Sequence, residues 1–123
     1  MYIKKITWLD KEAEEAAVLI TDGTHECLAF CHPCRLKEGT LVKSALISLN
    51  ERSVVAANKN AIPGIVKQSD DNDWSHSIVA IIEDKSSRIV AIGGIKLELS
   101  QLPGDLNQGD IIECYPSRLD LLG

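Results

Sequence analysis

No apolar stretch of this 123-residue sequence is as long as a membrane span. Even the apolar residues 78–82 are soon followed by charged ones, far short of the roughly 18 residues that a spanning helix needs. Residues 1–9 include Lys4 and Lys5, but they contain no apolar core of secretory length and no small-residue cleavage site. We therefore expect a soluble protein that keeps its first residues, contacts no membrane and stays in the cytoplasm.

A surplus of positive charge is also missing, because the formal net charge is −5. A molecule of this charge is repelled as a whole by a polyanion. Aromatic side chains, on which single-stranded bases stack, make up only 4% of the residues. If an oligonucleotide is bound, the candidate binding residues are four basic side chains of a locally positive segment and the tryptophan that follows it: Lys43, Arg52, Lys59, Lys67 and Trp74. The alternative is an ordinary solvated surface, with Trp74 as the anchor of its loop.

Motifs of nucleotide hydrolysis and of serine hydrolases are absent. The sequence contains no Gly-x-Ser-x-Gly, no Gly-x-x-x-x-Gly-Lys-Ser/Thr and no Gly-x-Gly-x-x-Gly. The acidic residues Asp70, Asp71 and Asp73 lack the glycine and the downstream glutamate of a helix–loop–helix calcium site. We therefore expect no catalytic activity and interpret these acids as a solvated loop.

Reactive side chains are concentrated in residues 25–34, which contain three of the four cysteines and two of the three histidines. The pair Cys31 and Cys34 has the two-residue spacing that can bind one zinc ion or close one disulfide. If residues 25–31 form a strand, then His25, Cys27 and Cys31 point to one face of it. The candidate metal ligands are Cys27, Cys31, Cys34 and His32, with His25, His76 or Cys114 as further contributors.

Three interpretations of these cysteines stay open at this point. A structural zinc site usually contains a second well-spaced pair of ligands, and the sequence has none. A thiol redox pair usually begins a helix in a βαβ pattern, whereas a turn follows Cys34. Buried, unreactive thiols of a cytoplasmic core explain the same residues without a cofactor. We expect no cofactor, and keep zinc binding or thiol redox chemistry at Cys31 and Cys34 as the alternative function.

Alternation of apolar and polar residues between turns predicts a mainly β protein. The Asp22-Gly23 pair between two apolar runs predicts a tight hairpin, and Gly93-Gly94 indicates a bulge or a sharp bend. A last strand is predicted at residues 110–115, and an irregular loop at about residues 59–76. The predicted hairpins pair residues 16–21 with 25–31, 41–49 with 53–57, and 77–83 with 88–99.

Five or six short strands, a long central connection and a glycine bend resemble an oligonucleotide- and oligosaccharide-binding (OB) barrel. The resemblance covers roughly residues 15–115 and concerns the fold, not a specific family; the chain departs from the pattern by lacking a predicted helix after the third strand. It implies a small antiparallel β-barrel forming a single domain over residues 1–123, with a small β-sandwich as the alternative. By analogy it implies a non-catalytic module that binds a protein or single-stranded nucleic acid. Exposed strand edges make self-association a third alternative.

Overall fold

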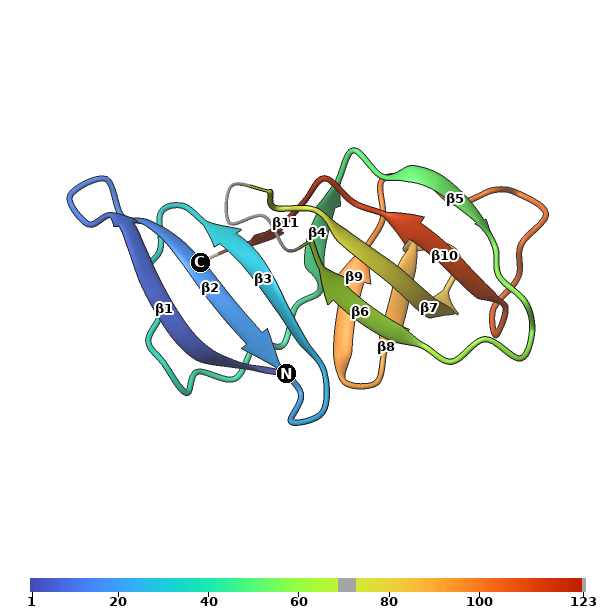
Figure 1. Cartoon of the computed structure of the whole chain (residues 1–123), viewed down its shortest axis with the longest axis horizontal. Helices are drawn as coiled ribbons and strands as arrows, with labels where there is room; N and C mark the ends of the chain where they lie inside the picture. Colours follow the sequence, from blue (N-terminus) through green and yellow to red (C-terminus); the bar gives the residue numbers. More distant parts are fainter. Residues whose placement is uncertain (69–72, 123) are drawn as a thin grey trace.

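The computed structural model describes residues 1–68 and 73–122, which are built from strands, turns and loops (Figure 1). Within this described part the mainly β prediction is confirmed, and no helix is long and apolar enough to cross a membrane. Asp70 and Asp71 lie outside the described residues. The eleven strands are β1 (Tyr2–Asp10), β2 (Glu15–Thr21), β3 (Glu26–Cys31), β4 (Leu46–Leu49), β5 (Arg52–Ala56), β6 (Gly64–Lys67), β7 (His76–Asp84), β8 (Ile89–Ile92), β9 (Ile95–Glu98), β10 (Ile111–Tyr115) and β11 (Arg118–Leu121).

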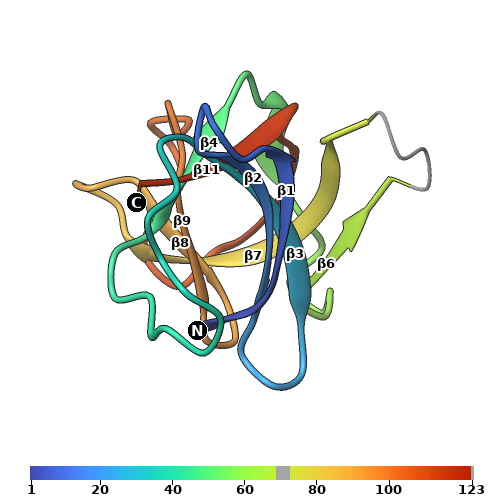
Figure 2. The same cartoon turned by 90° about the vertical axis from the view of Figure 1, so that its left-hand side faces the viewer.

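All eleven strands belong to one sheet, in the order β1-β2-β3-β11-β4-β9-β8-β7-β10-β5, with β6 paired to β7. Most neighbours are antiparallel, as predicted, but β11 runs parallel to β3, and β4 parallel to β9. The sheet is therefore mixed. Figure 2 shows the strands curling about a central axis, which is compatible with a barrel-like fold, although β1 and β5 end the sheet without closing it.

One apolar core lies inside this curled sheet. Strand side chains alternate between the two faces of a sheet, and β3 follows the rule, with Cys27, Ala29 and Cys31 buried and Leu28 and Phe30 only half-buried. The same alternation on the other strands brings buried aliphatic side chains from both ends of the sheet into a single cluster. The core therefore holds β1–β3 against the remaining strands.

The hairpin predicted around Asp22-Gly23 is confirmed, because β2 and β3 pair from Thr21 opposite Glu26 to Ala16 opposite Cys31. Gly23 has a φ of 99°, which glycine adopts without steric cost. The loop contains four residues, one more than the predicted strand ends left, and the Asp22 carboxylate accepts hydrogen bonds from two backbone N–H groups within it.

The hairpin predicted for residues 41–49 and 53–57 is wrong. β4 pairs with β11 and β9, and β5 pairs with β10. Asn50 has a φ of 51°, and the chain turns away from β4 there. β11 lies beside β4 where β5 was expected. The sequence did not indicate β11, because only four residues form it.

The Gly93-Gly94 pair reverses the chain completely instead of bending one strand. It forms a two-residue turn between β8 and β9, in which Ile92 pairs with Ile95. Gly93 has a φ of 55°, and a Cβ atom there would lie only 2.5 Å from the Asp22 carboxylate. Glycine is therefore required both by the turn and by the close approach of the β2–β3 loop.

The predicted irregular loop at about residues 59–76 contains a strand. β6 pairs antiparallel with the first half of β7, from Gly64 opposite Val79 to Lys67 opposite His76. β8 pairs with the second half of β7 on the same side, and β10 lines the other side. Pro63 and the acidic residues that follow β6 concealed this short strand in the sequence.

Candidate functional site

A group of apolar side chains covers the outer surface of β6, β7, β10 and β5, which lie side by side in Figure 1. On these strands every second residue points into the core, and the residues between point outward. The apolar outward residues with Glu113 and Tyr115 between them, together with Ile62 just before β6, are hereafter called the apolar face: Val55, Ile62, Val66, Val79, Ile81, Ile111, Glu113 and Tyr115. Ser77 and Glu83 also point outward on β7, and Glu83 forms an ion pair with Lys96.

The apolar face exposes large aliphatic side chains to water. Ile62 is 85% exposed, Val66 66%, Val55 44% and Ile81 38%. The strand register places their neighbours in rows, since Val79 lies opposite Glu113 and Ile81 opposite Ile111. A hollow of about 270 Å³ opens here, lined by Ile62, Gly64, Val66, Ser77, Ile78, Val79, Glu113 and Tyr115. Contiguous exposed apolar surface of this kind is typical of interaction sites.

Glu113 is the one carboxylate within the apolar face. It lies between Val79 of β7 and Val55 of β5, and side chains directly opposite one another on paired strands are close neighbours. Across the described part of the chain, its half-buried carboxylate has neither an ion-pair nor a hydrogen-bond partner. The apolar face therefore has one unpaired negative charge at its centre.

Three of the four predicted binding bases lie at the two ends of the apolar face. Arg52 pairs with Tyr115 at one end, and Lys67 follows Val66 at the same end. Both act on Asp73, whose pKa is lowered first by hydrogen bonds from Ser75 and then by these two cations. A hollow of about 350 Å³ at this end is lined by Arg52, Asp73, Ser75 and Ser117.

Lys59 and Lys43 are separated from that pair. Lys59 lines a hollow of about 290 Å³ with Asp110 and Ile111, at the opposite end of β5. Lys43 follows Val42, whose backbone N–H donates to the Met1 carbonyl beside β1. The structure thus brings Arg52 and Lys67 together, but it does not assemble the four bases into one positive surface.

Trp74 packs as a loop anchor would. Its ring meets Phe30 of β3 edge-on, with centroids 5.7 Å apart. Arg118 also contacts Phe30, since its guanidinium carbon lies 4.6 Å from the ring centroid. The nitrogens of Arg118 donate to Asp120 at 2.6 and 3.0 Å. These contacts fix the chain just before β7 against β3 and β11.

Within the described residues, Cys31 and Cys34 lie beside each other, but no third proposed zinc ligand is grouped with them. Cys27, Cys31 and Cys34 are buried free thiols, whereas His32 is exposed. Burial raises the pKa of Cys27 and of Cys31 to about 12, and for Cys31 the neighbouring Cys34 acts in the same direction. Among residues 1–68 and 73–122, no three His, Cys, Asp or Glu side chains are grouped as metal ligands. The thiolate form, which zinc binding and redox chemistry require, is disfavoured at Cys27 and Cys31.

Cys114 and His76, considered as more distant ligands, also face the interior. Burial raises the pKa of Cys114 to about 12. The Nε2 atom of His76 accepts a hydrogen bond from the backbone N–H of Leu28 at 3.1 Å. β11 pairs with β3 only at Phe30 and Cys31, so it does not reach the Leu28 N–H. His76 supplies the acceptor for that group instead.

Burial lowers the pKa of His76 from its ordinary value of 6.5 to about 4, although the nearby Trp74 backbone opposes the change. In the neutral ring, acceptance at Nε2 assigns the proton to Nδ1, which has no hydrogen-bond partner within the described chain. Protonation of Nε2 would remove the acceptor of the Leu28 N–H. His76 is therefore a neutral link between β7 and β3.

We expect this link to make stability depend on pH. Because the folded pKa of His76 lies below the unfolded value, the unfolded chain binds more protons between pH 6.5 and about 4. The free energy of unfolding should fall by about 2 kcal/mol from pH 7 to pH 5 through this group. Urea denaturation at several pH values measures the slope. In His76→Gln, which keeps an acceptor but cannot titrate, the slope should be lost; an unchanged slope would assign it to other groups.

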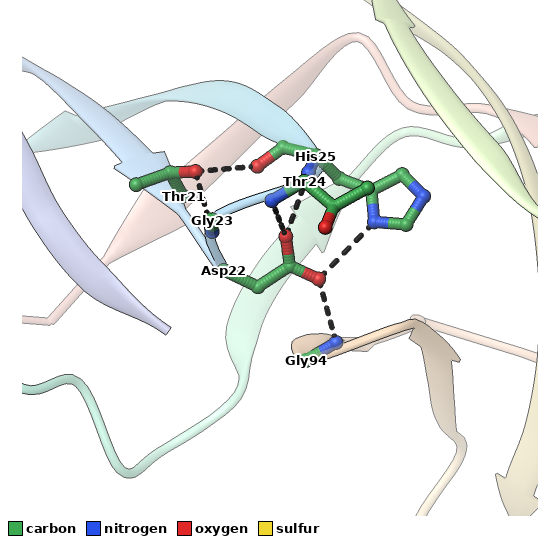
Figure 3. Close-up of polar contacts among 6 residues, drawn as sticks. All are labelled: Thr21, Asp22, Gly23, Thr24, His25 and Gly94. Atoms are coloured by element: carbon green, nitrogen blue, oxygen red, sulfur yellow. Dashed lines mark hydrogen bonds and ion pairs between the residues drawn. The ribbon is translucent and has the colours of Figure 1, made fainter.

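A second polar cluster joins the β2–β3 loop to the β8–β9 turn (Figure 3). Asp22 Oδ1 accepts from the backbone N–H groups of Thr24 at 2.8 Å and His25 at 2.6 Å. Its Oδ2 lies 3.1 Å from His25 Nδ1 and accepts from the Gly94 N–H at 2.8 Å. Thr21 completes the loop by donating to the His25 carbonyl at 2.8 Å. All these groups bond to one another, so we interpret the cluster as a structural lock.

Comparisons with protein-family models, with curated proteins and with solved structures gave no match to this chain. The fold defines it as a small all-β protein with a mixed, barrel-like sheet. No residue of the apolar face was predicted as a site; of its surroundings, the sequence indicated only the bordering basic residues Arg52, Lys59 and Lys67. The available signal was the uninterrupted apolar run 78–82, because a strand with one solvated face should alternate more clearly.

Proposed function

We propose that this protein is a non-catalytic binding module of OB-like β-barrel type, and that it binds another protein on the apolar face. The observation that carries the proposal is the contiguous set of outward aliphatic side chains around the hollow on β6, β7 and β10. Exposed residues such as Ile62 and Val66 contribute nothing to the core, and covering them would remove apolar surface from water.

A protein is favoured over an oligonucleotide as the partner. The four candidate bases are divided among separate places, and Arg52 and Lys67 already act on Asp73. Phe30 and Trp74 pack against each other, and the exposed rings of Tyr2 and Trp8 lie on β1, at the opposite end of the sheet order from Arg52 on β5. Since the net charge is −5, the molecule as a whole does not attract phosphates. The apolar face with charged groups at its ends is instead the arrangement of a protein interface.

The ionisable groups of the apolar face do not form a catalytic pair. They are the Glu113 carboxyl and the Tyr115 hydroxyl, and neither donates to or accepts from a nucleophile in the described chain. Catalysis by acid–base or nucleophilic chemistry requires such positioned partners. The face is therefore proposed to bind and not to transform its partner.

The proposal can be tested by selecting binders from a random-peptide library displayed on phage. We expect the selected peptides to lose about tenfold or more of their affinity for the Val66→Asp variant, because a charge at this 66% exposed position disrupts apolar contact. The matched control is Leu41→Asp, a 61% exposed leucine beside β1, which should leave binding unchanged. Fluorescence anisotropy with labelled peptides gives the dissociation constants.

Two outcomes would contradict this function. Peptides that bind Val66→Asp as well as the unmodified protein would place the binding surface elsewhere. An oligothymidylate that binds, that weakens with added salt, and that depends on Arg52 and Lys67 would assign the nucleic-acid function instead.

A further inference from the structure

We infer that the partner places a lysine or arginine side chain, flanked by apolar residues, against Glu113 at the centre of the apolar face. The inference rests on the proposed function and specifies the chemistry of its partner. It follows from the surroundings of Glu113, from the total charge of the protein and from the positions of the bases at the ends of the face.

The surroundings of Glu113 make an entirely apolar partner unsuitable. Val55 and Val79 lie directly opposite it on the neighbouring strands, and Ile111 and Tyr115 are the next outward residues along β10. In the free protein, water solvates the carboxylate. A purely apolar partner covering these four residues would remove that water and leave an unpaired charge, which is costly. A cation at the same place offsets the loss.

A second copy of this chain is a poor occupant for the same reason. In a two-fold symmetric dimer, the same surface of each copy meets the other, so the apolar faces would bring one Glu113 toward the other. Each copy also has a formal charge of −5. Like charges oppose that association, whereas a basic partner is attracted over a distance.

The charges at the ends of the apolar face limit where the partner carries its cation. Arg52 and Lys67 lie at one end, and Lys59 lies at the other, beside Ile111. Glu113 is the acid between them. Each end also holds an acid, Asp73 with Arg52 and Lys67 and Asp110 with Lys59, so the bases there already lie beside a carboxylate, whereas Glu113 has no partner in the described chain. The cation should therefore occupy the middle of the bound segment, with apolar residues on both sides.

The experiment uses one phage-selected peptide, labelled with fluorescein, and anisotropy titrations against the full-length protein. We expect selected peptides to share a central lysine or arginine among apolar residues. Glu113→Gln should weaken binding by about tenfold or more, and Glu113→Lys should abolish it. A peptide whose central lysine is replaced by glutamate should fail on the unmodified protein and recover on Glu113→Lys. Glu12→Gln, an exposed acid in the β1–β2 turn, is the matched control.

The outcomes distinguish this inference from the function on which it rests. Recovery of binding by the charge exchange supports both. If the peptides depend on Val66 but contain no shared cation and bind Glu113→Gln unchanged, the inference is overturned and the proposed function stands. If no peptide depends on Val66, the function fails and the inference fails with it. Thermal melting of Glu113→Gln and Glu113→Lys verifies that both variants are folded.

Discussion

Replacing Leu119 with alanine is expected to lower the free energy of unfolding by about 3 kcal/mol. Leu119 is fully buried on β11, the strand that lies between β3 and β4 and so connects β1–β3 to the rest of the sheet. β11 pairs in parallel with β3 through Asp120 and Leu121, and antiparallel with β4 from Arg118 to Asp120. Shortening the side chain removes apolar contacts and leaves a cavity in the core beneath β11.

The neighbouring Leu122 offers a control for this substitution. It is 72% exposed, so Leu122→Ala should change the free energy of unfolding by less than about 0.5 kcal/mol. Urea denaturation followed by circular dichroism compares both variants with the unmodified protein. Equal effects of the two substitutions would show that β11 does not contribute to the core as described.

Replacing Asp22 with alanine should cost about 3 kcal/mol of stability. The Asp22 side chain is only 10% exposed, and its carboxylate accepts hydrogen bonds from three backbone N–H groups and lies against the His25 ring. Alanine would leave the Gly94 N–H without its acceptor and would release the β2–β3 loop from the β8–β9 turn. Hydrogen bonds to a charged, little-exposed group are among the stronger ones.

The contribution of the Asp22 carboxylate to the free energy of unfolding depends on pH in a defined direction. Burial alone would raise the pKa of Asp22, but the hydrogen bonds from His25, Gly94 and Thr24 together hold that pKa well below its ordinary value of 3.8. The stabilisation by the carboxylate is therefore complete above that ordinary value and is lost as the pH falls below it.

Urea denaturation at neutral pH measures the Asp22→Ala effect. Asp105→Ala, which removes an exposed carboxylate with no partner in the described chain, is the control and should be nearly neutral. If Asp22→Ala were as mild as Asp105→Ala, the carboxylate would not hold the two turns together.

Local chemistry made part of the fold predictable. Asp22-Gly23 identified the β2–β3 hairpin, and alternation placed Cys27 and Cys31 on the same buried face. The failures involve residues that are distant in the sequence. β11 has only four residues, and its parallel pairing brings Phe30 beside Asp120. No periodicity within either segment encodes that choice of neighbour.

The candidate site was difficult to predict for a related reason. Residues 78–82 are apolar on both faces, so alternation alone does not say that Val79 and Ile81 point outward. Their exposure follows from β6 and β10 on the two sides of β7, and β6 lies where a loop was expected. Lysines and arginines could be identified from the sequence as candidate binding residues. Glu113 could not, because only the strand pairing places it between Val55 and Val79.

Three separate connections hold β3 and its hairpin loop to the remainder of the sheet. β11 joins β3 to β4, Asp22 joins the loop to Gly94, and His76 receives the Leu28 N–H. The apolar face lies outside all three and uses none of their side chains. Variants of Val66 and Glu113 should therefore change binding without changing stability, whereas variants of Leu119 and Asp22 should do the opposite.

Mapping of the bound peptide by nuclear magnetic resonance tests the central claim most directly. Titration of the isotope-labelled protein with a phage-selected peptide should change the amide shifts most on β6, β7 and β10, at residues such as Val66, Val79 and Glu113. Shift changes concentrated instead on β1–β3, or around Arg52 and Trp74 with the apolar face unchanged, would show that the apolar face is not the binding surface.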